Sequence, residues 1–565
     1  MTYQEIRRKF LEFFEKRGHT IVPSSSLLPA DPSVLFTTAG MQQFKPYYTG
    51  EADAVKNFGS LNTASIQKCL RTSDIDEVGD ESHLTFFEML GNFSFGGYFK
   101  KEAIQWAHEF ITKEMNLPID YVSVFGGEGD IPADEESEKI WKSINPGMAV
   151  KKFGRKDNFW GPTGNEGPCG PTTEIYVKGM EIWNLVFNEY YHKADGTLEK
   201  LKTPGIDTGM GLERLAMVVQ QKENIFETDL FLGLMERLNA LKMSARGRRI
   251  IADHIRAITF LVTDGVLPSN KDRGYVLRRL MRRVITQGQI HGEIDFGALF
   301  AWLCENYRSF YPELDQQKIV LAFDEERGKF TKTLKQGLRE LGRLEQVDTP
   351  TAFKLYESYG LPFEVIKELG GEKAAGLTRE SFDEIFKQHQ TKSRAGAEKK
   401  FGGHGLLPGT GELKAGNEAE LKKATRLHTA THLLHAALRK VLGNEVHQAG
   451  SDITAERLRF DFTFPRKLTE TELKKVEDSV NEVISQDRPV TKEEMAFENA
   501  LQTGALSFFG QKYPPRVNVY SVGDFSKELC GGPHVSHTGE IGRVKIVKEE
   551  AVSVGMRRIR AVLVV

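Results

Sequence analysis

The sequence predicts an α+β protein with several domains, and three observations support this prediction. The chain has 565 residues, which is too long for a single hydrophobic core. Up to about residue 235 strand-like and helix-like segments alternate, whereas from about residue 246 to 400 the pattern is almost wholly helical. Beyond a stretch rich in glycine and lysine, helices and strands alternate again. We therefore expect domains at 1–240, 241–395 and 421–565, with a linker at 396–420.

The composition is that of an ordinary soluble protein, with 40% hydrophobic and 27% charged residues. No apolar run is long enough to span a bilayer, and charges interrupt the N-terminal MTYQEIRRKFLEFF, so we expect neither a membrane partner nor a secretory signal. A cytoplasmic location follows. The four cysteines lie far apart, which argues against structural disulfides. Because 76 Lys and Arg balance 78 Asp and Glu, any contact with nucleic acid must come from local basic patches.

The individual elements follow from periodicity. Ile6, Phe10, Phe13 and Phe14 recur at helical spacing, so the first helix has one buried face. The stretch EIWNLVFNEYY at 181–191 predicts a buried strand. Further helices are predicted in four segments: MGLERLAMVVQQ, IIADHIRAITFLV, RGYVLRRLMRRVITQG and VLAFDEERGKFTKTLKQGLREL. In the last domain, ATRLHTATHLLHAALRKVL predicts a helix and RRIRAVLVV a strand.

Four residues of the last domain have the types and spacing of a metal site. His428 and His432 are four residues apart and share one helix face, and Cys530 and His534 lie on the glycine-rich turn ELCGGPH. Three imidazoles and a thiolate are suited to tetrahedral Zn²⁺. The alternative is a pair of ordinary helix histidines and a buried thiol. The second pair of residues favours the metal.

A basic helix is predicted in the second domain. Its apolar side holds Val276, Leu280 and Val284, and four arginines lie on adjacent turns: Arg278, Arg279, Arg282 and Arg283. Such a face suits phosphates. A solvated helix face explains the same pattern, although the neighbouring Arg246, Arg248 and Arg249 favour nucleic acid.

The first domain offers three charged residues in polar turns. Asp207 and Arg214 flank the turn DTGMGLER, and Arg71 lies in KCLRTSDID. Two arginines brought together would hold a triphosphate. The sequence has no GxxxxGK[ST] motif, so this is not a P-loop. An ordinary surface ion pair is the alternative for each arginine.

Ten segments occur in the order found in one known family. They are PSSSLLPADPSVLFTTAGMQQFKPYY, HLTFFEMLGNFSFGGYFK, NFW…GPCGPTTEI, EIWNLVF, DTGMGLER, IADHIR, LPSNKDRGYVLRRLMRR, LYESYGLPFE, LHTATHLLHAAL and ELCGGPH. In these segments the chain resembles the class II alanyl-tRNA synthetases. The resemblance implies an antiparallel-sheet catalytic domain at 1–240, a helical tRNA-recognition domain at 241–395 and a zinc-containing α+β editing domain at 421–565.

The resemblance also assigns roles for alanine and ATP. Arg71 matches the arginine on the α-phosphate and the substrate carboxylate, Arg214 the arginine on the γ-phosphate, and Met89 a residue beside the adenine. The residues that match the alanine pocket are Trp160, Asn184, Val186, Asp207 and Gly209, with Asp207 pairing to the substrate ammonium. Mg²⁺ is expected to share the phosphate charge.

A pocket for alanine rejects serine only about a hundredfold and glycine always fits, so a second hydrolytic site is the expected remedy. His428, His432, Cys530 and His534 match the family's Zn²⁺-containing editing site, and Gln448 matches a residue there linked to serine recognition. Pro533 replaces the usual threonine of this motif, which removes one backbone N–H.

For RNA, the family reads a G·U pair in the acceptor stem of tRNA(Ala) from the minor groove. Asn270 matches one reader. Glu357 stands where the other reader is usually aspartate, and it keeps the acceptor chemistry with a longer reach. Many relatives carry a C-terminal extension that commonly supports dimerisation, and its absence here predicts a monomer.

Three other functions compete with this interpretation. A deacylase acting only on mischarged tRNA would not need Arg71, Asp207 and Arg214. A non-catalytic RNA-binding paralogue would be expected to have lost these motif arginines. Activation of serine or glycine is the third alternative, and the pocket residues favour alanine over it.

Overall fold

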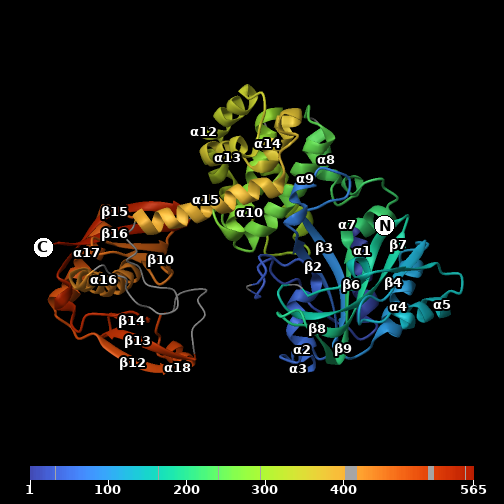
Figure 1. Ribbon diagram of the computed structural model, residues 1–565, viewed down its shortest axis with the longest axis horizontal. Helices are drawn as coiled ribbons and strands as arrows, with labels where there is room; N and C mark the ends of the chain where they lie inside the picture. The colour runs from blue at the N-terminus through green and yellow to red at the C-terminus, as the bar shows by residue number, and fades with distance from the viewer. Residues whose placement is uncertain are drawn as a thin grey trace. The chain divides into compact units, whose positions relative to one another are not determined.

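The computed structural model describes the chain in two compact units, Met1–Leu377 and Thr378–Val565 (Figure 1). The residues outside the description are Pro32, Thr163, Ala240, Glu293, 401–416, 507–514, Val554 and Val565; of 390–400 and Ser553 only the backbone is described. The predicted linker at 396–420 lies mostly outside the described residues. Its first five residues belong to helix α15 (Arg379–Lys400), and α16 (Glu418–Leu442) begins shortly before its end.

The first unit is built on a nine-stranded, largely antiparallel sheet. Its strands follow the order β1-β2-β3-β9-β8-β7-β4-β5, and β6 pairs with β7. Their bounds are β1 Thr20–Ile21, β2 Asn62–Leu70, β3 Phe86–Ser94, β4 Tyr121–Phe125, β5 Val150–Phe153, β6 Phe159–Trp160, β7 Gly167–Val177, β8 Met180–His192 and β9 Leu198–Gly211. The predicted strand at 181–191 is thus confirmed as β8, and it lies between β7 and β9 in the sheet.

The helices of the first unit are mostly packed on the sheet or gathered at one end of it (Figure 1). They are α1 Tyr3–Glu15, α2 Lys45–Thr49, α3 Ala54–Phe58, α4 Lys100–Glu109, α5 Glu135–Ile144, α6 Arg155–Asn158, α7 Leu212–Val219, α8 Leu232–Asn239, α9 Ala245–Thr263, α10 Asp272–His291, α11 Phe296–Tyr307, α12 Gln316–Arg343, α13 Thr349–Tyr359 and α14 Phe363–Gly370. The capping box of Thr2 and Glu5 starts α1, and the predicted face of Ile6, Phe10, Phe13 and Phe14 is buried.

The sheet and the helices after residue 240 share one buried interface. Phe86 of β3 stacks on Phe260 of α9 with ring centroids 4.3 Å apart. Close by, Glu213 of α7 binds Arg256 of α9 in a buried ion pair. These buried aromatic and charged contacts join the sheet to the helices that follow it, and both belong to the compact unit Met1–Leu377.

In the described residues of the second unit, helix α15 is followed by three further helices and two small antiparallel sheets. The four-stranded sheet has the order β10-β11-β16-β15, and the three-stranded sheet the order β12-β13-β14. The bounds are β10 Gln448–Ile453, β11 Leu458–Thr463, β12 Thr491–Ala496, β13 Arg516–Val522, β14 Ser526–Leu529, β15 Arg543–Ser553, β16 Met556–Val564, α16 Glu418–Leu442, α17 Glu470–Ser485 and α18 Phe497–Gln502.

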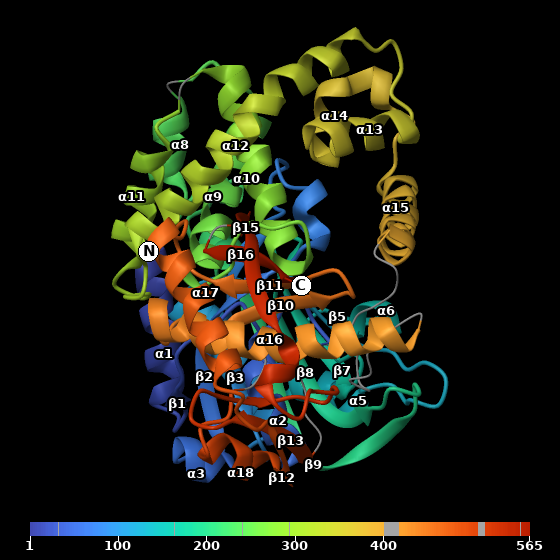
Figure 2. The ribbon, with the colours of Figure 1, turned by 90° about the vertical axis from the view of Figure 1, so that its left-hand side faces the viewer.

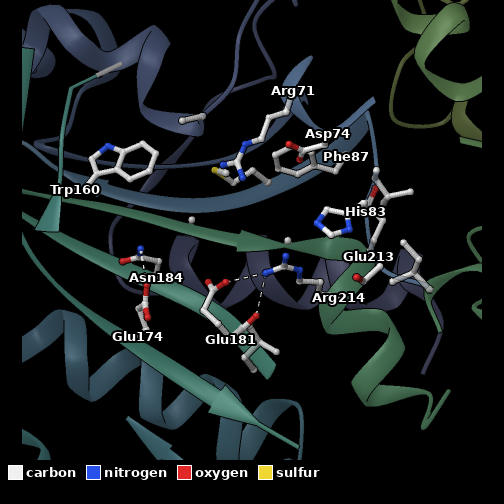
Figure 3. A pocket seen from close by; sticks show the side chains of 18 of the residues that line it. Arg71, Asp74, His83, Phe87, Trp160, Glu174, Glu181, Asn184, Glu213 and Arg214 are labelled. Carbon is white, nitrogen blue, oxygen red and sulfur yellow. Dashed lines mark hydrogen bonds and ion pairs between the residues drawn. The ribbon is translucent and has the colours of Figure 1, made fainter. Parts of the chain in front are cut away.

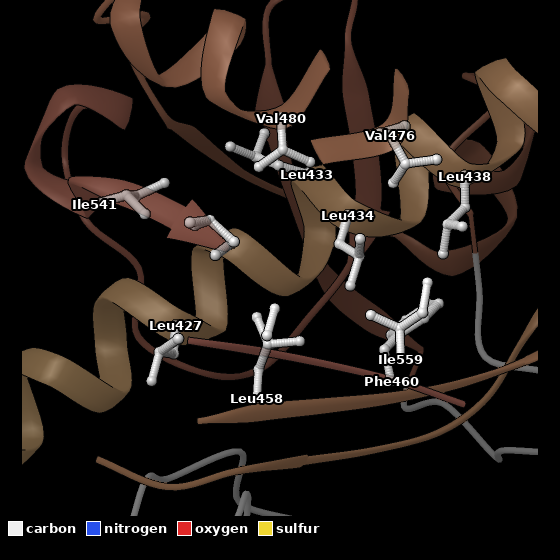
Figure 4. Packing of buried hydrophobic residues seen from close by; sticks show 14 of the residues in the cluster. Leu427, Leu433, Leu434, Leu438, Leu458, Phe460, Val476, Val480, Ile541 and Ile559 are labelled. Carbon is white, nitrogen blue, oxygen red and sulfur yellow. The ribbon is translucent and has the colours of Figure 1, made fainter. Parts of the chain in front are cut away.

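Helix α16 lies between the two sheets of this unit, with α17 beside it on the side of the larger sheet (Figure 2). Leucines at helical spacing on α16 pack against Phe460 of β11 and Ile559 of β16, and Val476 and Val480 of α17 complete the core (Figure 4). This packing holds α16 in one rotation, so His428 and His432 have a defined direction. Among the helices of the described residues, none has the length and apolar character that a bilayer crossing requires.

Candidate active site and metal centre

A cavity of about 220 Å³ lies over the strands β3, β7, β8 and β9 of the first unit (Figure 3). All eight residues predicted for alanine and ATP line it: Arg71, Met89, Trp160, Asn184, Val186, Asp207, Gly209 and Arg214. The strand register explains their convergence, because Asn184 pairs with Gly209 and Val186 pairs with Asp207 across β8 and β9. The neighbouring strand β3 brings Met89 opposite Gly211.

Arg71 is the first residue after β2, and it lines the cavity. Its backbone N–H donates to the Thr85 carbonyl at 2.9 Å, and its guanidinium carbon lies 4.9 Å from the centre of the Phe87 ring. Within the described part of the chain, no carboxylate forms an ion pair with it. Arg71 therefore presents a positive charge to the cavity.

Arg214 approaches the same space from the first turn of α7 (Figure 3). Its Nη1 is 2.8 Å from a carboxylate oxygen of Glu181 on β8, and its side chain is 43% exposed. A guanidinium has five N–H donors, so this ion pair leaves others for an anion. Glu181 orients Arg214 and was missed by the sequence reasoning.

Two buried carboxylic acids lie at the inner end of the cavity. Burial raises the pKa of Asp207, which is 6% exposed, to about 7. Burial is also the main cause that raises the pKa of Glu174 to about 7, although Tyr176 and Ser123 donate to it at 2.7 and 3.2 Å. A bound cation would restore the charged form of Asp207, so this end of the cavity suits an ammonium group.

Asn184 and Gly209 complete the lining for specific physical reasons. The Asn184 side-chain N–H donates to Glu174 at 3.3 Å, while its Oδ1 is buried and has no hydrogen-bond partner among the described residues. This oxygen is an acceptor available to a ligand. A Cβ at Gly209 would meet Met89 Sδ at 2.9 Å, so glycine is needed for Met89 to occupy its place.

The four predicted metal ligands come together in the second unit. One ligand atom from each of His428, His432, Cys530 and His534 can be chosen so that all lie within 4.8 Å of one another. His428 Nε2 is 3.3 Å from Cys530 Sγ. The Nε2 atoms of His432 and His534 are buried and find no partner in the described part of the chain. These donors have the chemistry and the spacing that Zn²⁺ requires.

The other ring nitrogens of these histidines are hydrogen-bonded away from the centre. His428 Nδ1 contacts the Pro533 carbonyl at 2.9 Å, His432 Nδ1 contacts a Glu528 carboxylate oxygen, and His534 Nδ1 contacts Thr429 Oγ1 at 3.1 Å. Partners of this kind select the tautomer that points Nε2 at a metal. Pro533 serves through its carbonyl, so the lost N–H at this position leaves the contact to His428 intact.

The thiol of Cys530 is prepared as a thiolate. Burial alone would raise its pKa, but the neighbouring His432, His428 and His534 lower it far below the usual range. Thiolate is the form that binds a metal. Gln448, predicted to belong to the same site, lies on β10 and donates to Ser451 Oγ at 3.1 Å.

The arginines of α10 form two stripes with different partners. Arg278 contacts the side chain of Asn270 and approaches Glu326, whereas Arg282 binds Glu326 at 2.8 Å and the Gly360 carbonyl at 2.9 Å. Asn270 and Glu357 are both exposed, so a nucleic acid can reach them.

The second stripe, Arg279 and Arg283, turns toward the interior. Arg279 pairs with Asp76 and Glu364, and Arg283 is completely buried against Glu368 and backbone carbonyls. The prediction that Arg283 presents its charge to RNA phosphate is therefore wrong. The loop at 75–78 and α14 cover this side of the helix, and helical periodicity alone does not show such a covering.

Two family profiles match the chain. That of the tRNA synthetases class II (A) matches residues 5–436, and that of the threonyl and alanyl tRNA synthetase second additional domain matches residues 517–560. The alanine–tRNA ligase of Borrelia hermsii is 43% identical over 608 aligned positions, which cover 100% of both chains. That of Treponema denticola is 44% identical over 100% of this chain and 99% of its own.

The chain belongs to the alanine–tRNA ligase family.

It is thus a class II aminoacyl-tRNA synthetase, a ligase, with the antiparallel catalytic sheet and the additional domain that the resemblance implied. The alanine–tRNA ligase of Thermotoga petrophila is 39% identical over 100% of this chain and 80% of its own length. Among solved structures, the pyrrolysyl-tRNA synthetase of Desulfitobacterium hafniense is 11% identical, with a TM-score of 0.26, and the match covers 40% of this chain and 72% of that protein.

For this alanine–tRNA ligase family member, sequence reasoning missed the residues that orient the recognised ones. Glu528 is the first residue of the quoted motif ELCGGPH, two positions before Cys530, so a search for a partner of the histidines would have found it. Glu174 stands near the end of GPCGPTTEI and is buried with most of its strand β7. Its sequence offers no sign that its carboxylate turns toward Asn184.

Proposed function

We propose that the first unit joins alanine and ATP into alanyl-adenylate and transfers the alanyl group to the 3′ end of tRNA(Ala). The observation that carries this proposal is the convergence of Arg71, Asp207 and Arg214 on one cavity. Membership of the alanine–tRNA ligase family supports the choice of amino acid. In the first step the alanine carboxylate attacks the α-phosphorus and pyrophosphate leaves; in the second the terminal ribose hydroxyl attacks the acyl carbon and AMP leaves.

Alanine is held by charge at one end and by shape at the other. The ammonium group pairs with the carboxylate of Asp207 and with the free Oδ1 of Asn184, both at the buried end of the cavity. The methyl group lies against Val186 and Trp160. Larger side chains are excluded by these walls, whereas glycine fits and serine adds only a hydroxyl.

ATP is positioned by the two arginines. Arg71 contacts the α-phosphate and the alanine carboxylate, Arg214 contacts the γ-phosphate, and Met89 lies beside the adenine. The arginines neutralise charge that moves to pyrophosphate during the attack, and their fixed orientation lowers the cost of bringing the reactants together. Mg²⁺ would share this phosphate charge.

The second unit hydrolyses Ser-tRNA(Ala) and Gly-tRNA(Ala) that the first site makes in error. His428, His432, Cys530 and His534 would hold Zn²⁺, since their free donor atoms converge and their other nitrogens are already bonded. Zn²⁺ supplies positive charge that orients the ester end of the tRNA or acidifies a water. Gln448 contributes to recognition of the serine side chain. The match to the second additional domain supports this function.

The acceptor stem is recognised by the helical part of the first unit. Asn270 and Glu357 contact the G·U pair through the minor groove, and Arg278 and Arg282 support them near the phosphates.

We expect the protein to be a cytoplasmic monomer. Light scattering of micromolar protein checks the oligomeric state, and a stable dimer would contradict the expectation.

The test of the proposed function is alanine-dependent exchange of pyrophosphate into ATP, compared with serine and glycine. We expect strong exchange with alanine, weaker exchange with the other two, and loss of exchange in Asp207→Ala. Exchange with none of the three would leave a deacylase or an RNA-binding paralogue. Exchange that prefers serine or glycine would reassign the substrate.

A further inference from the structure

The loop between β2 and β3, residues 71–85, carries Arg71 and is held in place by the helices that follow the sheet. It includes the short helical turn Ser73–Asp76, and Asp74, Ser82 and His83 from it line the cavity. Arg283 of α10 donates to the carbonyl oxygens of Ile75 at 2.6 Å and Val78 at 3.2 Å. This loop is therefore pinned from outside the sheet.

Two further contacts reach the loop. The neighbouring arginine of the same stripe, Arg279, places Nη2 2.5 Å from Asp76 Oδ1. At the other end of the loop, the Asp253 carboxylate of α9 accepts from the Thr85 N–H at 2.9 Å. The carbonyl of Thr85 in turn accepts from the Arg71 N–H at 2.9 Å, so this contact is one hydrogen bond away from the phosphate-binding residue.

The groups that hold the loop are themselves fixed. His254 lies between Asp253 and Arg283, with its Nδ1 2.7 Å from the carboxylate and its Nε2 3.2 Å from the guanidinium. Because arginine only donates, His254 Nε2 accepts and Nδ1 carries the proton toward Asp253. On the other side, Glu364 and Glu368 of α14, four residues apart, pair with Arg279 and Arg283, also four apart.

The side chains of Asp253, His254 and Arg283 are completely buried. Removing one partner from a buried charge is costly, so these contacts favour the observed arrangement of the loop. The same burial prevents Arg283 from contacting RNA. Asp253 and His254, in the segment IADHIR, are also completely buried, so they cannot contact RNA directly.

We infer that Asp253, His254, Arg279 and Arg283 are positioning residues for ATP, acting through the loop 71–85. They hold the loop so that Arg71 meets the α-phosphate. This inference rests on the proposed function of the cavity as the ATP site. Of the four α10 arginines, one stripe thus serves the nucleotide and only Arg278 and Arg282 remain for the RNA.

The test uses Arg279→Gln in the full chain, because the Arg279 side chain is 13% exposed whereas those of the other three residues are completely buried. In tRNA-free exchange we expect the KM for ATP to rise about tenfold or more, since small displacements of positioned groups cost that much. The KM for alanine should rise less than the KM for ATP, because Arg71 also contacts the alanine carboxylate but Asp207 and Asn184 still hold the ammonium group. Arg279→Lys should restore part of the affinity through its charge on Asp76.

Two comparisons separate positioning from mere stability. Asp76→Asn removes the loop's side of the same contact, and the double variant should be no worse than Arg279→Gln alone. Arg17→Gln is the matched control, since Arg17 forms a 2.8 Å ion pair with Glu109 in the same unit and does not line the cavity. Its KM for ATP should equal that of the wild type.

A rise in the KM for tRNA with an unchanged KM for ATP in Arg279→Gln would make this residue an RNA contact and overturn the inference. Calorimetric titration with ATP gives a second measurement that needs no turnover. Equal ATP affinities of the wild type and Arg279→Gln overturn the inference. A wild type that binds ATP without exchange, together with a weakened variant, would instead count against the proposed function and leave the positioning role supported.

Discussion

The cavity of the first unit and the metal centre of the second are both assembled from distant segments, but they are prepared for different ligands. In the cavity, the Arg71 cation and the buried acids Asp207 and Glu174 come from three different elements, the loop after β2, β9 and β7. In the metal centre, the four ligand atoms lie within 4.8 Å of one another, and the Nδ1 atom of each of the three histidines has a partner. Separated charges suit an extended, zwitterionic substrate with a triphosphate, whereas converging lone pairs suit one cation.

The largest effect is expected from Asp207→Asn. Loss of the carboxylate leaves the alanine ammonium buried without its counter-charge, so alanine-dependent pyrophosphate exchange should fall roughly 30- to 1,000-fold. The metal content of the variant, measured by elemental analysis, should equal that of the wild type because the metal centre is built from other residues. Exchange within threefold of the wild type would show that Asp207 is not the ammonium site.

Cys530→Ala should impair the metal centre of the second unit and leave the cavity of the first unit unchanged. Because the proposed zinc site would lose its thiolate ligand, hydrolysis of Ser-tRNA(Ala) should fall about a hundredfold. Alanine-dependent exchange should stay within about twofold, because it depends on the first unit. Metal-free wild-type protein that still deacylates Ser-tRNA(Ala) would contradict the metal assignment.

Glu528→Gln tests whether the partner of a histidine ligand contributes to the metal affinity of the centre. The carboxylate contacts both His432 and His435, so its loss weakens the orientation of one ligand without removing it. Zn²⁺ affinity, measured by competition with a chelator, should fall about 10- to 100-fold. Glu540→Gln changes another glutamate of the same unit that caps the turn after His537, and it should leave the affinity unchanged. Equal affinities of Glu528→Gln and the wild type would remove Glu528 from the site.

The smallest effect is expected in the pH dependence of kcat/KM for alanine. Asp207 must be ionised to bind the ammonium, and its pKa of about 7 in the free protein means that protonation competes below that pH. The kcat/KM for alanine in exchange should therefore rise about tenfold per pH unit below pH 7 and level off above it. Glu174→Gln should keep this rise, although the pKa of Glu174 is also about 7, because its carboxylate acts through Asn184. Loss of the rise in Glu174→Gln would assign the pH dependence to Glu174.

The elements were accessible from the sequence where a local pattern is strong. The helix at Ile6–Phe14, the strand at 181–191 and the helix that carries His428 and His432 follow from apolar spacing alone, and all three are present. Helical spacing also places the four α10 arginines on neighbouring turns. It does not tell which of them another element covers, and for that reason Arg283 was predicted to face RNA although it is buried.

The contacts that orient the site residues could not be predicted from local sequence patterns. Glu181 and Arg214 are 33 positions apart, and Glu174 and Asn184 meet only because β7 and β8 pair in one register. A shift of that register by one residue would turn their side chains to the other face of the sheet. The sequence has no local feature that records such a register.

By itself the sequence determined the family, the strands and helices, and the residue types available for chemistry, because these depend on composition and on short spacing. Only the tertiary structure decided which charges are buried, which nitrogen of each histidine faces the metal centre, and that Arg279 and Arg283 contact the loop 71–85. The physical reason is that electrostatic energies depend on distance and on exclusion of water. Both quantities are set when distant segments pack together.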